Sequence, residues 1–476
     1  MGHARTAPRL AALPLLLALL AAAAPPAGDG PPPDPAAGAG PLGWAAVGEG
    51  TTGGAGAGQD STHVVRTRAE LVAALDNGGR RAEPKIIHVV GDIDGAETDT
   101  GDLLGEQDYA PGWDLARYQA CFGEDGAEWR DDRHPWCDEQ RRLRTTGSNA
   151  QKRQIQLDVP SNTTLLGEDG ARLLGVYLSV RSSENIVLRD LHLEAPVDYF
   201  PSWDPWDGAD GAWNARFDAF SAVTGSRIWI DHCTFTDGRF PNSEAPEGFH
   251  GEPVERHDGL LDLEDGTDLV TVSYSRFVDH AKTALLGSGD GKGDRDRGRL
   301  RVTFHHNLFD DSAQRSPRVR FGRVHAFNNY FTGSTDDPDY PMRSEELGGG
   351  DYFLGMGLES LLVSEFNAFE YDGPGASPDI LVSALGGHRF LDRGSWYGGQ
   401  PVDLNALAEG KFTVAAAAAR EAAAEQGVEP PAWALEEFST DVGWSPAAEY
   451  PYVDAVLRSP DAVRAAVLSE AGPGRR

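Results

Sequence analysis

The stretch LRVTFHHNLFDDSAQRSPRVRFGRVHAFNNYF, residues 300–331, contains two short apolar runs that each end in phenylalanine. Side chains alternate between the two faces of a β-strand, so runs of this length and composition predict short strands. The two terminal phenylalanines, Phe309 and Phe331, are 22 residues apart. A unit this short predicts one coil of a solenoid.

Runs of the same kind recur on both sides of this stretch, at residues 185–193, 227–235, 269–277 and 361–370. Phenylalanine recurs at positions 235, 277, 309, 331 and 369, at intervals of 22 to 42 residues. A minimum unit with insertions of variable length is typical of a parallel β-helix, in which loops of any length leave the corners of stacked coils. A propeller or sandwich would require tight antiparallel hairpins, and those signals are sparse.

The fold class that these patterns predict is therefore all-β, a parallel β-helix with helical caps and with long loops that form a cleft on one side. We expect Asn307, Asn328 and Asn367 to form a ladder at the turns between coils. Helical spacing at 67–78 predicts an N-terminal cap, and the segments 414–427 and 459–472 are rich in helix formers. We expect a single domain over residues 41–476.

The N-terminus reads as an export signal. Arg5 and Arg9 precede an apolar run over residues 10–24, which is too short for a comfortable membrane span. We therefore expect residues 1–40 to be a signal peptide and a disordered leader, and the protein to be secreted into the extracellular space. No later stretch is apolar enough to span a bilayer, so we expect no membrane partner.

The net charge of the chain limits the classes of molecule that it can bind. The chain has 74 Asp and Glu against 42 Lys and Arg, a formal net charge of -32. Such an excess of acid argues against nucleic acid or an anionic membrane as the main partner. At first sight it also argues against an acidic substrate.

Three cysteines occur in the chain. In an oxidising compartment Cys121 and Cys137 are predicted to pair, and the closed loop would be stabilised by roughly 3 kcal/mol. Cys233 would then remain single, in a strand-like segment where a buried, unreactive thiol is expected.

Acidic residues precede two of the predicted strands. Asp258 and Asp262 lie before one strand, and Asp218 lies before another. Residues one coil apart in a β-helix stack about 4.8 Å from each other, which could bring the three carboxylates together. Clustered carboxylates repel unless a cation lies among them, and hard oxygen ligands suit Ca²⁺. The alternative is that these residues are solvated turn acids.

Basic residues follow one coil further along. Alternation places Arg318 and Arg320 on one face of their run, and Val319 and Phe321 on the other. A surface strand protected from edge pairing by its charges is the alternative explanation. Local positive charge in so acidic a chain favours a functional role.

Three segments resemble the signature segments of the pectate lyases of polysaccharide lyase family 1, in the same order. They are WIDHCTFTDG, HDGLLDLEDGTDLVTVSYSRFVDHAKTALLGSGD and the stretch that opens this section. The resemblance covers roughly residues 43–474, and the family fold is a right-handed parallel β-helix. It implies a secreted pectate lyase that acts on de-esterified polygalacturonate of plant cell walls, and we expect a monomer.

The resemblance also implies roles for individual residues. Its calcium ligands fall on Asp218, Asp258 and Asp262, and its catalytic base falls on Arg315. Its contacts to substrate carboxylates fall on Lys282 and Arg320. The implied reaction is a β-elimination that leaves 4,5-unsaturated oligogalacturonides.

Several alternatives remain open at this point. Arginine is an unusual base because its guanidinium holds its proton tightly, and His257 or Lys282 are the substitutes. Asp231 and His232 also suggest a catalytic pair, although we expect both to be structural. A galacturonan hydrolase on the same fold would need paired carboxylates and no metal. A non-catalytic β-helix that binds polysaccharide is the third class.

Overall fold

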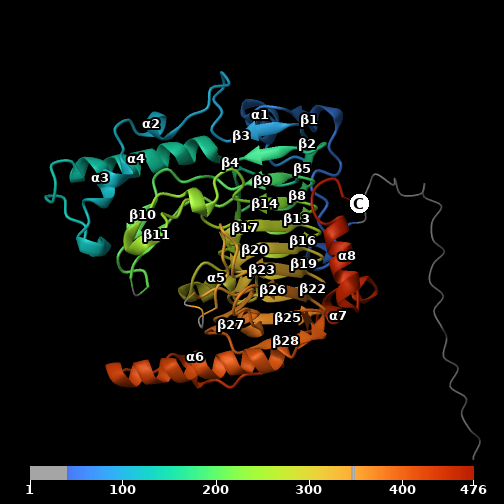
Figure 1. Ribbon diagram of the computed structural model, residues 1–476. Coiled ribbons are helices and arrows are strands. Elements are labelled where there is room, and N and C mark those ends of the chain that lie inside the picture. The colour runs from blue at the N-terminus through green and yellow to red at the C-terminus, as the bar shows by residue number, and fades with distance from the viewer. Residues whose placement is uncertain (1–39, 209, 345–346, 348, 476) are drawn as a thin grey trace, which may run out of the picture. The chain divides into compact units, whose positions relative to one another are not determined.

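The computed structural model describes residues 40–208, 210–344, 347 and 349–475. The expected export leader, Gly40 apart, lies outside the described residues. Residues 40–476 fall into one compact unit. Three long sheets run along this unit, and the coils that link them are stacked from the N-terminal end to the C-terminal end (Figure 1).

Sheet 1 consists of β1 (Thr62–Val65), β2 (Lys85–Val89), β5 (Thr163–Gly167), β8 (Glu184–Arg189), β13 (Ser226–Asp231), β16 (Asp268–Ser273), β19 (Arg301–His305), β22 (Arg323–Phe327), β25 (Leu361–Glu365) and β28 (Phe390–Arg393). Sheet 2 consists of β4 (Gln156–Asp158), β7 (Tyr177–Arg181), β12 (Phe220–Val223), β15 (Leu261–Glu264), β18 (Ala284–Leu286), β21 (Arg318–Val319), β24 (Leu354–Gly357) and β27 (Val382–Leu385).

Sheet 3 consists of β3 (Asp92–Asp94), β6 (Arg172–Leu174), β9 (His192–Glu194), β14 (Thr234–Thr236), β17 (Arg276–Lys282), β20 (Leu308–Gln314), β23 (Tyr330–Ser334), β26 (Ala368–Asp372), β29 (Trp396–Tyr397) and β30 (Gln400–Pro401). Neighbouring strands in the three sheets are parallel, except that β29 and β30 are antiparallel. Each coil contributes one strand to each sheet, which is the predicted parallel β-helix.

Each apolar run predicted as one strand is in fact two strands that meet at a corner. The run at 300–309 divides into β19 and β20, and the run at 322–331 divides into β22 and β23. The corner residues His306 and Asn328 have φ of 56° and 51°. A residue with left-handed φ turns the chain from sheet 1 to sheet 3, and neither position is a glycine that would signal the turn.

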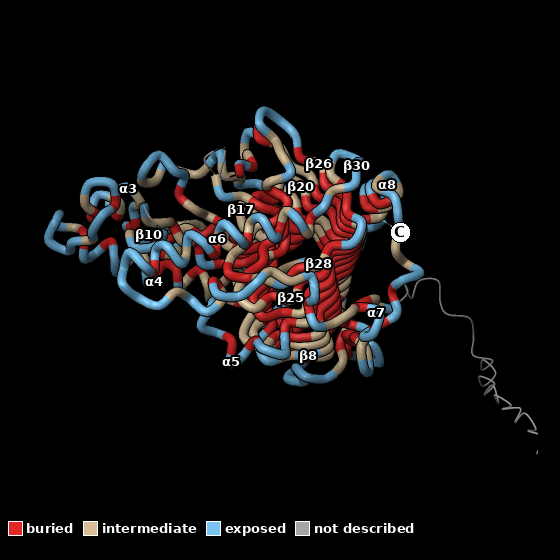
Figure 2. Tube along the Cα trace, turned by 90° about the horizontal axis from the view of Figure 1, so that it is seen from below, coloured by how far each residue is buried: buried red, intermediate tan, exposed pale blue. Residues whose placement is uncertain are grey.

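The interior of the coils carries two ladders. Phe235, Phe277, Phe309, Phe331 and Phe369 stack ring on ring, with centroids 4.6 to 5.1 Å apart. The predicted phenylalanine repeat is thus a continuous column in the core. Figure 2 shows buried residues gathered inside the coils and exposed residues on the outer turns.

The asparagine ladder differs from the prediction by one residue. Asn307 donates to Asn329 Oδ1 from both its backbone and its side chain, each at 3.0 Å, and Asn329 bonds in the same way to Asn367. Asn328 instead bonds to Phe366 and Leu457. Asn328 occupies the left-handed corner, so its side chain leaves the ladder.

Helices cover both ends of the coils. Helix α1 (Arg68–Asp76) begins at an N-cap, Thr67, and packs on β1 and β2 at the N-terminal end. Helix α6 (Leu404–Gln426) packs on β27 and β28 at the other end, and it begins ten residues before the predicted segment (Figure 1). Helix α8 (Pro460–Glu470) lies in the second helix-forming segment, is capped by Ser459, and packs beside β23 and β26. The two short helices α5 (Gly293–Asp296) and α7 (Pro446–Glu449) lie in loops.

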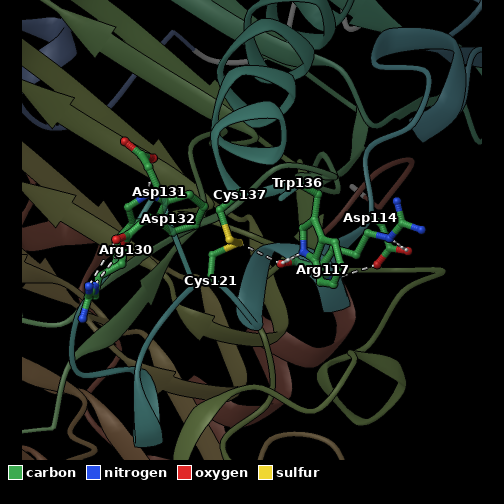
Figure 3. The surroundings of a disulfide bond; sticks show 9 residues. Asp114, Arg117, Cys121, Arg130, Asp131, Asp132, Trp136 and Cys137 are labelled. Carbon is green, nitrogen blue, oxygen red and sulfur yellow. Dashed lines mark hydrogen bonds and ion pairs between the residues drawn. A yellow bond between two sulfur atoms is a disulfide. The ribbon is translucent and has the colours of Figure 1, made fainter. Parts of the chain in front are cut away.

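A lobe projects from one side of the coils (Figure 1). It is formed by α2 (Glu106–Tyr109), α3 (Leu115–Gln119), α4 (Cys137–Ile155) and the hairpin of β10 (Ser202–Asp204) and β11 (Ala212–Asn214). The lobe has an aromatic core of its own, separate from the main core. A disulfide joins Cys121 to Cys137, with their Cα atoms 5.5 Å apart (Figure 3). Cys233 is free and buried, and burial raises the pKa of its thiol.

Within the described part of the chain, none of the helices has the length and the apolar character needed to cross a bilayer.

Candidate functional site

The predicted acids and arginines gather along sheet 2. Asp262 lies in β15 and Arg318 lies in β21, while Asp218 comes just before β12. The register places Ser221 beside Asp262, Asp262 beside Leu285, and Leu285 beside Arg318. Asp262 and Arg318 are therefore two coils apart on one ladder of the sheet.

Asp218 and Asp262 meet over the backbone of Gly259. The amide of Gly259 donates to Asp218 Oδ1 at 3.1 Å. A β-carbon on Gly259 would stand 2.3 Å from Asp262 Oδ1 and 3.3 Å from Asp218 Oδ1. Only glycine fits there, and its absent side chain lets the two carboxylates approach each other. Asp262 Oδ1 is buried and has no hydrogen-bond partner.

The carboxylates are electrostatically strained without a counter-charge. Burial, and then the charges of Asp262 and Asp258, raise the pKa of Asp218 well above its usual range. Burial and Asp258 raise the pKa of Asp262 to about 8, although Arg315 opposes the shift. A hard cation beside these oxygens would relieve both effects, and an orphaned buried oxygen fits a cation ligand.

The third acid stands apart from this pair. Asp258 Oδ1 lies 3.8 Å from Lys282 Nζ, and its side chain is partly exposed. Across the described ranges, no group of three or more His, Cys, Asp or Glu is arranged to hold a metal ion. The structure thus joins Asp218 and Asp262 closely, and it leaves Asp258 within electrostatic range of both.

Lys282 has a carboxylate partner that the sequence did not reveal. Its Nζ forms an ion pair with Glu255 Oε1, and Glu255 Oε2 accepts from the amide of Ala215 at 3.1 Å. Burial raises the pKa of Glu255, and Lys282 opposes that shift. Glu255 lies in an irregular loop with no motif, so no pattern in the sequence could have indicated it.

Arg320 is also engaged. Its Nε donates to Asp290 Oδ1 at 2.7 Å, and its Nη1 donates to the carbonyl of Gly287 at 2.9 Å. Arg320 is only 9% exposed, whereas the side chain of Asp290 is 64% exposed. The guanidinium of Arg320 is therefore already paired with a carboxylate that is largely open to solvent.

The predicted alternation in this segment fails at its end. Val319 packs in the main core as expected. Phe321 has φ of 59° and does not join that core, and the guanidinium of Arg297 lies 5.4 Å from its ring centroid. Strand β21 ends at Val319, so the face to which Phe321 points is set by a turn.

Arg315 and Arg318 lack partners for part of their guanidinium groups. The Nε atoms of both are buried with no hydrogen-bond acceptor. Burial lowers the pKa of Arg318, and the charges of Arg320 and Arg315 lower it further. The three arginines are thus close enough to repel one another, and an anion among them would be attracted.

His257 is unsuited to act as the base. Its Nδ1 lies 3.0 Å from the carbonyl oxygen of Pro196, and its Nε2 lies 2.9 Å from that of Phe240. Both ring nitrogens face carbonyl acceptors, so neither is free to take a proton from another molecule.

The alternative catalytic pair, Asp231 and His232, is held by contacts to neighbouring strands and side chains. Asp231 accepts from Arg189 at 2.9 Å and from Ser273 at 2.6 Å. The ring of His232 stacks on Tyr274 with centroids 5.0 Å apart.

A cavity of about 490 Å³ lies between the lobe and the coils. Its walls include Lys282 and Gln314 from sheet 3, and Trp213, His250 and Glu255 from the lobe side. Gln314 directly precedes Arg315 in the chain, so the cavity lies next to that arginine in sequence. Such a hollow suits a sugar, with aromatic faces on one side and charged groups on the other.

The structure combines a parallel β-helix with acidic and basic side chains gathered along sheet 2 and a cavity beside them. A model of the family described as pectate lyase matches residues 142–448. The chain therefore belongs to the pectate lyase family, and it is a polysaccharide lyase.

Individual relatives agree with this assignment. A pectate lyase of Bacillus subtilis is 34% identical over 417 residues, which are 87% of each chain. Pectate lyase E of Dickeya chrysanthemi is 40% identical over 266 residues, 55% of this chain and 63% of that protein.

Solved structures resemble this one over most of its length. A pectate lyase bound to a hexasaccharide superposes with a TM-score of 0.75 at 32% identity, and covers 91% of this chain and 96% of its own. A pectate lyase from Acidovorax avenae superposes with a TM-score of 0.76 at 27% identity, over 92% and 95%.

Proposed function

We propose that the protein is a secreted, calcium-dependent pectate lyase that cleaves de-esterified polygalacturonate by β-elimination. The observation that supports this best is the position of Asp262. Its Oδ1 is buried without a hydrogen-bond partner, and its carboxylate lies beside that of Asp218 over Gly259. Asp262 is also two coils from Arg318 on the same ladder of sheet 2. A cation bound to the acids would attract a uronate, and the arginines would attract it from the other side.

The calcium ligands in this proposal are Asp218, Asp258 and Asp262. Asp218 and Asp262 already face each other across Gly259. Asp258 would join them as a ligand by exchanging its contact with Lys282 for one with the cation. When bound, Ca²⁺ would draw negative charge from the C6 carboxylate of a galacturonate and so make the neighbouring C5 proton more acidic.

The chain's own residues would then perform the elimination. The neutral form of Arg315 takes the proton from C5 and becomes a guanidinium. The electron pair of the C5–H bond forms the C4–C5 double bond, and the glycosidic oxygen leaves C4 with its bonding pair and takes a proton from water.

Lys282 and Arg320 would hold substrate carboxylates. Each already binds a protein carboxylate, Glu255 and Asp290 respectively, so each is oriented towards an anion. A guanidinium can bind a carboxylate through two parallel hydrogen bonds, which fixes the ring as well as its charge. This arrangement reconciles an acidic surface with an acidic substrate, because positive charge is confined to the cleft.

We also propose that residues 41–476 act as one catalytic domain, that residues 1–40 direct export, and that the enzyme acts as a monomer. The compact unit over residues 40–476 and the apolar N-terminal run support the first two proposals.

One assay separates this function from its rivals. The protein is incubated with polygalacturonate, with calcium or with chelator, and the ultraviolet absorbance of an unsaturated uronide is followed. A calcium-dependent lyase produces that absorbance only without chelator. A hydrolase would release reducing ends without the absorbance, and a binding module would produce neither.

A further inference from the structure

A second hollow lies on the lobe, and it shares Trp203 as a lining residue with the 490 Å³ cavity. It measures about 440 Å³, and we call it the aromatic pocket. The walls that matter here are Phe122, Trp129, Arg144, Trp203 and Trp206. The side chain of Trp203 is buried and so forms a fixed part of the wall of both hollows.

Trp206 is unusual in its exposure. Its side chain is 84% exposed, the largest value for any large apolar side chain in the described part of the chain. It follows β10 in a turn in which its backbone amide donates to Asp204 Oδ1 at 2.9 Å. Exposed tryptophan beside a preformed hollow is typical of a binding surface, because the ring offers a flat apolar face and gains by being covered.

The aromatic pocket also offers positive charge. Arg144 and Arg141 line it together with one acid, Glu128. Arg141 Nη2 forms ion pairs with Asp131 Oδ2 and Asp138 Oδ1, both at 3.1 Å. Arg144 donates from Nε to the carbonyl of Pro201 at 3.1 Å, and no carboxylate in the described residues lies within ion-pair distance of it. The guanidinium of Arg144 is therefore held in place without a close ion pair among the described residues. Burial raises the pKa of the Asp198 carboxyl, and the charge of Arg144 opposes that shift from a longer range.

The walls of the aromatic pocket are preorganised. The ring of Trp129 packs on those of Tyr118 and Phe122, with centroids 5.1 Å apart in both pairs. Trp203 Nε1 donates to the carbonyl of Gly126 at 2.8 Å. The Cys121–Cys137 disulfide ties α3 to the start of α4, as Figure 3 shows. Walls that are already fixed reduce the entropy lost when a ligand binds.

We propose that the aromatic pocket is a second binding site for a galacturonan chain, outside the catalytic cavity. The apolar face of a sugar ring lies on Trp206, and its carboxylate contacts Arg144. The choice of an anionic sugar rests on the proposed function and on the charge of Arg144. Two sites on one enzyme raise the effective concentration of a long chain at the cleft, whereas a short oligomer cannot reach both.

The first test measures binding without turnover. Native gels that contain polygalacturonate and EDTA report affinity as retardation of the band. Trp206→Ala should weaken retardation by about tenfold in apparent affinity, which corresponds to about 1.4 kcal/mol. Trp206→Phe retains a ring and should keep most of the affinity. Val414→Ala, which removes another exposed apolar side chain on α6, is the matched control and should match the parent.

The second test concerns the ligand class. Arg144→Gln should weaken retardation by polygalacturonate but not by fully methyl-esterified pectin, which has no carboxylate for the guanidinium to bind. Turnover of trigalacturonate should be the same in the parent and in Trp206→Ala. If the parent forms no unsaturated product from polygalacturonate in the presence of calcium, the proposed function fails, whatever the gels show.

Other outcomes would overturn the second site itself. Equal retardation of Trp206→Ala and the parent would remove Trp206 from binding. If Arg144→Gln lost retardation to the same extent in gels that contain a neutral polysaccharide, the ligand of the aromatic pocket would not be anionic. A parent that elutes as a dimer, beside a monomeric Trp206→Ala, would make this face an interface between copies of the chain.

Discussion

Arg320 donates from Nε to Asp290 Oδ1 at 2.7 Å, and the carboxylate of Asp290 is largely open to solvent. An arginine assigned to the substrate is therefore already bound to an internal anion. A galacturonate that reaches Arg320 must displace Asp290 or share the guanidinium with it. Under the proposed role of Arg320, affinity for substrate would thus depend on how tightly the protein binds its own carboxylate.

Asp290→Asn should lower the KM for polygalacturonate by about threefold, because a neutral amide competes less for the guanidinium than a carboxylate does. The kcat should change little, since Asp290 does not touch the reacting atoms. Initial rates over a range of substrate concentrations measure both constants. A rise in KM would show that Asp290 orients Arg320 and does not compete with substrate.

Arg315→Lys and Arg320→Lys should affect different kinetic constants. Lysine at 315 keeps the charge but cannot place a base at the same point, so kcat should fall by several orders of magnitude with KM little altered. Lysine at 320 cannot form two parallel hydrogen bonds to a carboxylate, so KM should rise by at least as large a factor as kcat falls. If Arg315→Lys keeps kcat within about tenfold, a loss of only ~1.4 kcal/mol, Arg315 is not the base.

The metal-free protein should lose stability as pH rises. The pKa of Asp262 is about 8 in the fold and near 4 in an unfolded chain, so the native state binds the extra proton between these values. The stability that this proton provides is complete below about pH 4 and is lost as pH rises through about 8. Melting temperature in EDTA, measured across this range, should fall.

Asp262→Asn is the control for this pH effect. The amide carries no charge to repel Asp218, so the EDTA-treated variant should show a flatter pH profile and should melt higher than the parent near pH 8. Calcium should raise the melting temperature of the parent at that pH and should have less effect on the variant. A parent that is insensitive to calcium would remove the metal from these residues.

Thiol titration of the denatured, unreduced protein should find one reactive group, Cys233. The disulfide between Cys121 and Cys137 closes the lobe, and Cys233 is buried in the coils until the chain unfolds. Titration of the native protein should therefore find none. Three thiols after denaturation would mean that the disulfide does not form.

The repeating part of the fold could be predicted because its signal is physical and local. Each phenylalanine of the core column occupies the same place in its coil, and five such positions are enough to reveal the period. The corners could not be predicted so well. His306 and Asn328 adopt left-handed φ without glycine, and the ladder consequently runs through Asn329, one residue from the predicted position.

The candidate site was predictable only where its residues lie on the coils. Asp262 and Arg318 share a ladder of sheet 2, so stacking brings them near each other. Glu255 and Asp290 come from irregular loops, and nothing in their spacing indicates that they meet Lys282 and Arg320. Contacts between a loop and a coil depend on the loop's path, which periodicity does not describe.

The column of phenylalanine rings has a consequence for the chemistry above it. Asp218, Asp262 and Arg318 lie on the coils whose core rings are Phe235, Phe277 and Phe331. The hydrogen bonds between neighbouring strands set how far apart these acids and arginines stand, and the stacked rings fill the core at the same spacing. Phe277→Leu would leave a gap in this column, so the packing that supports the coil of Asp262 would weaken from inside the molecule.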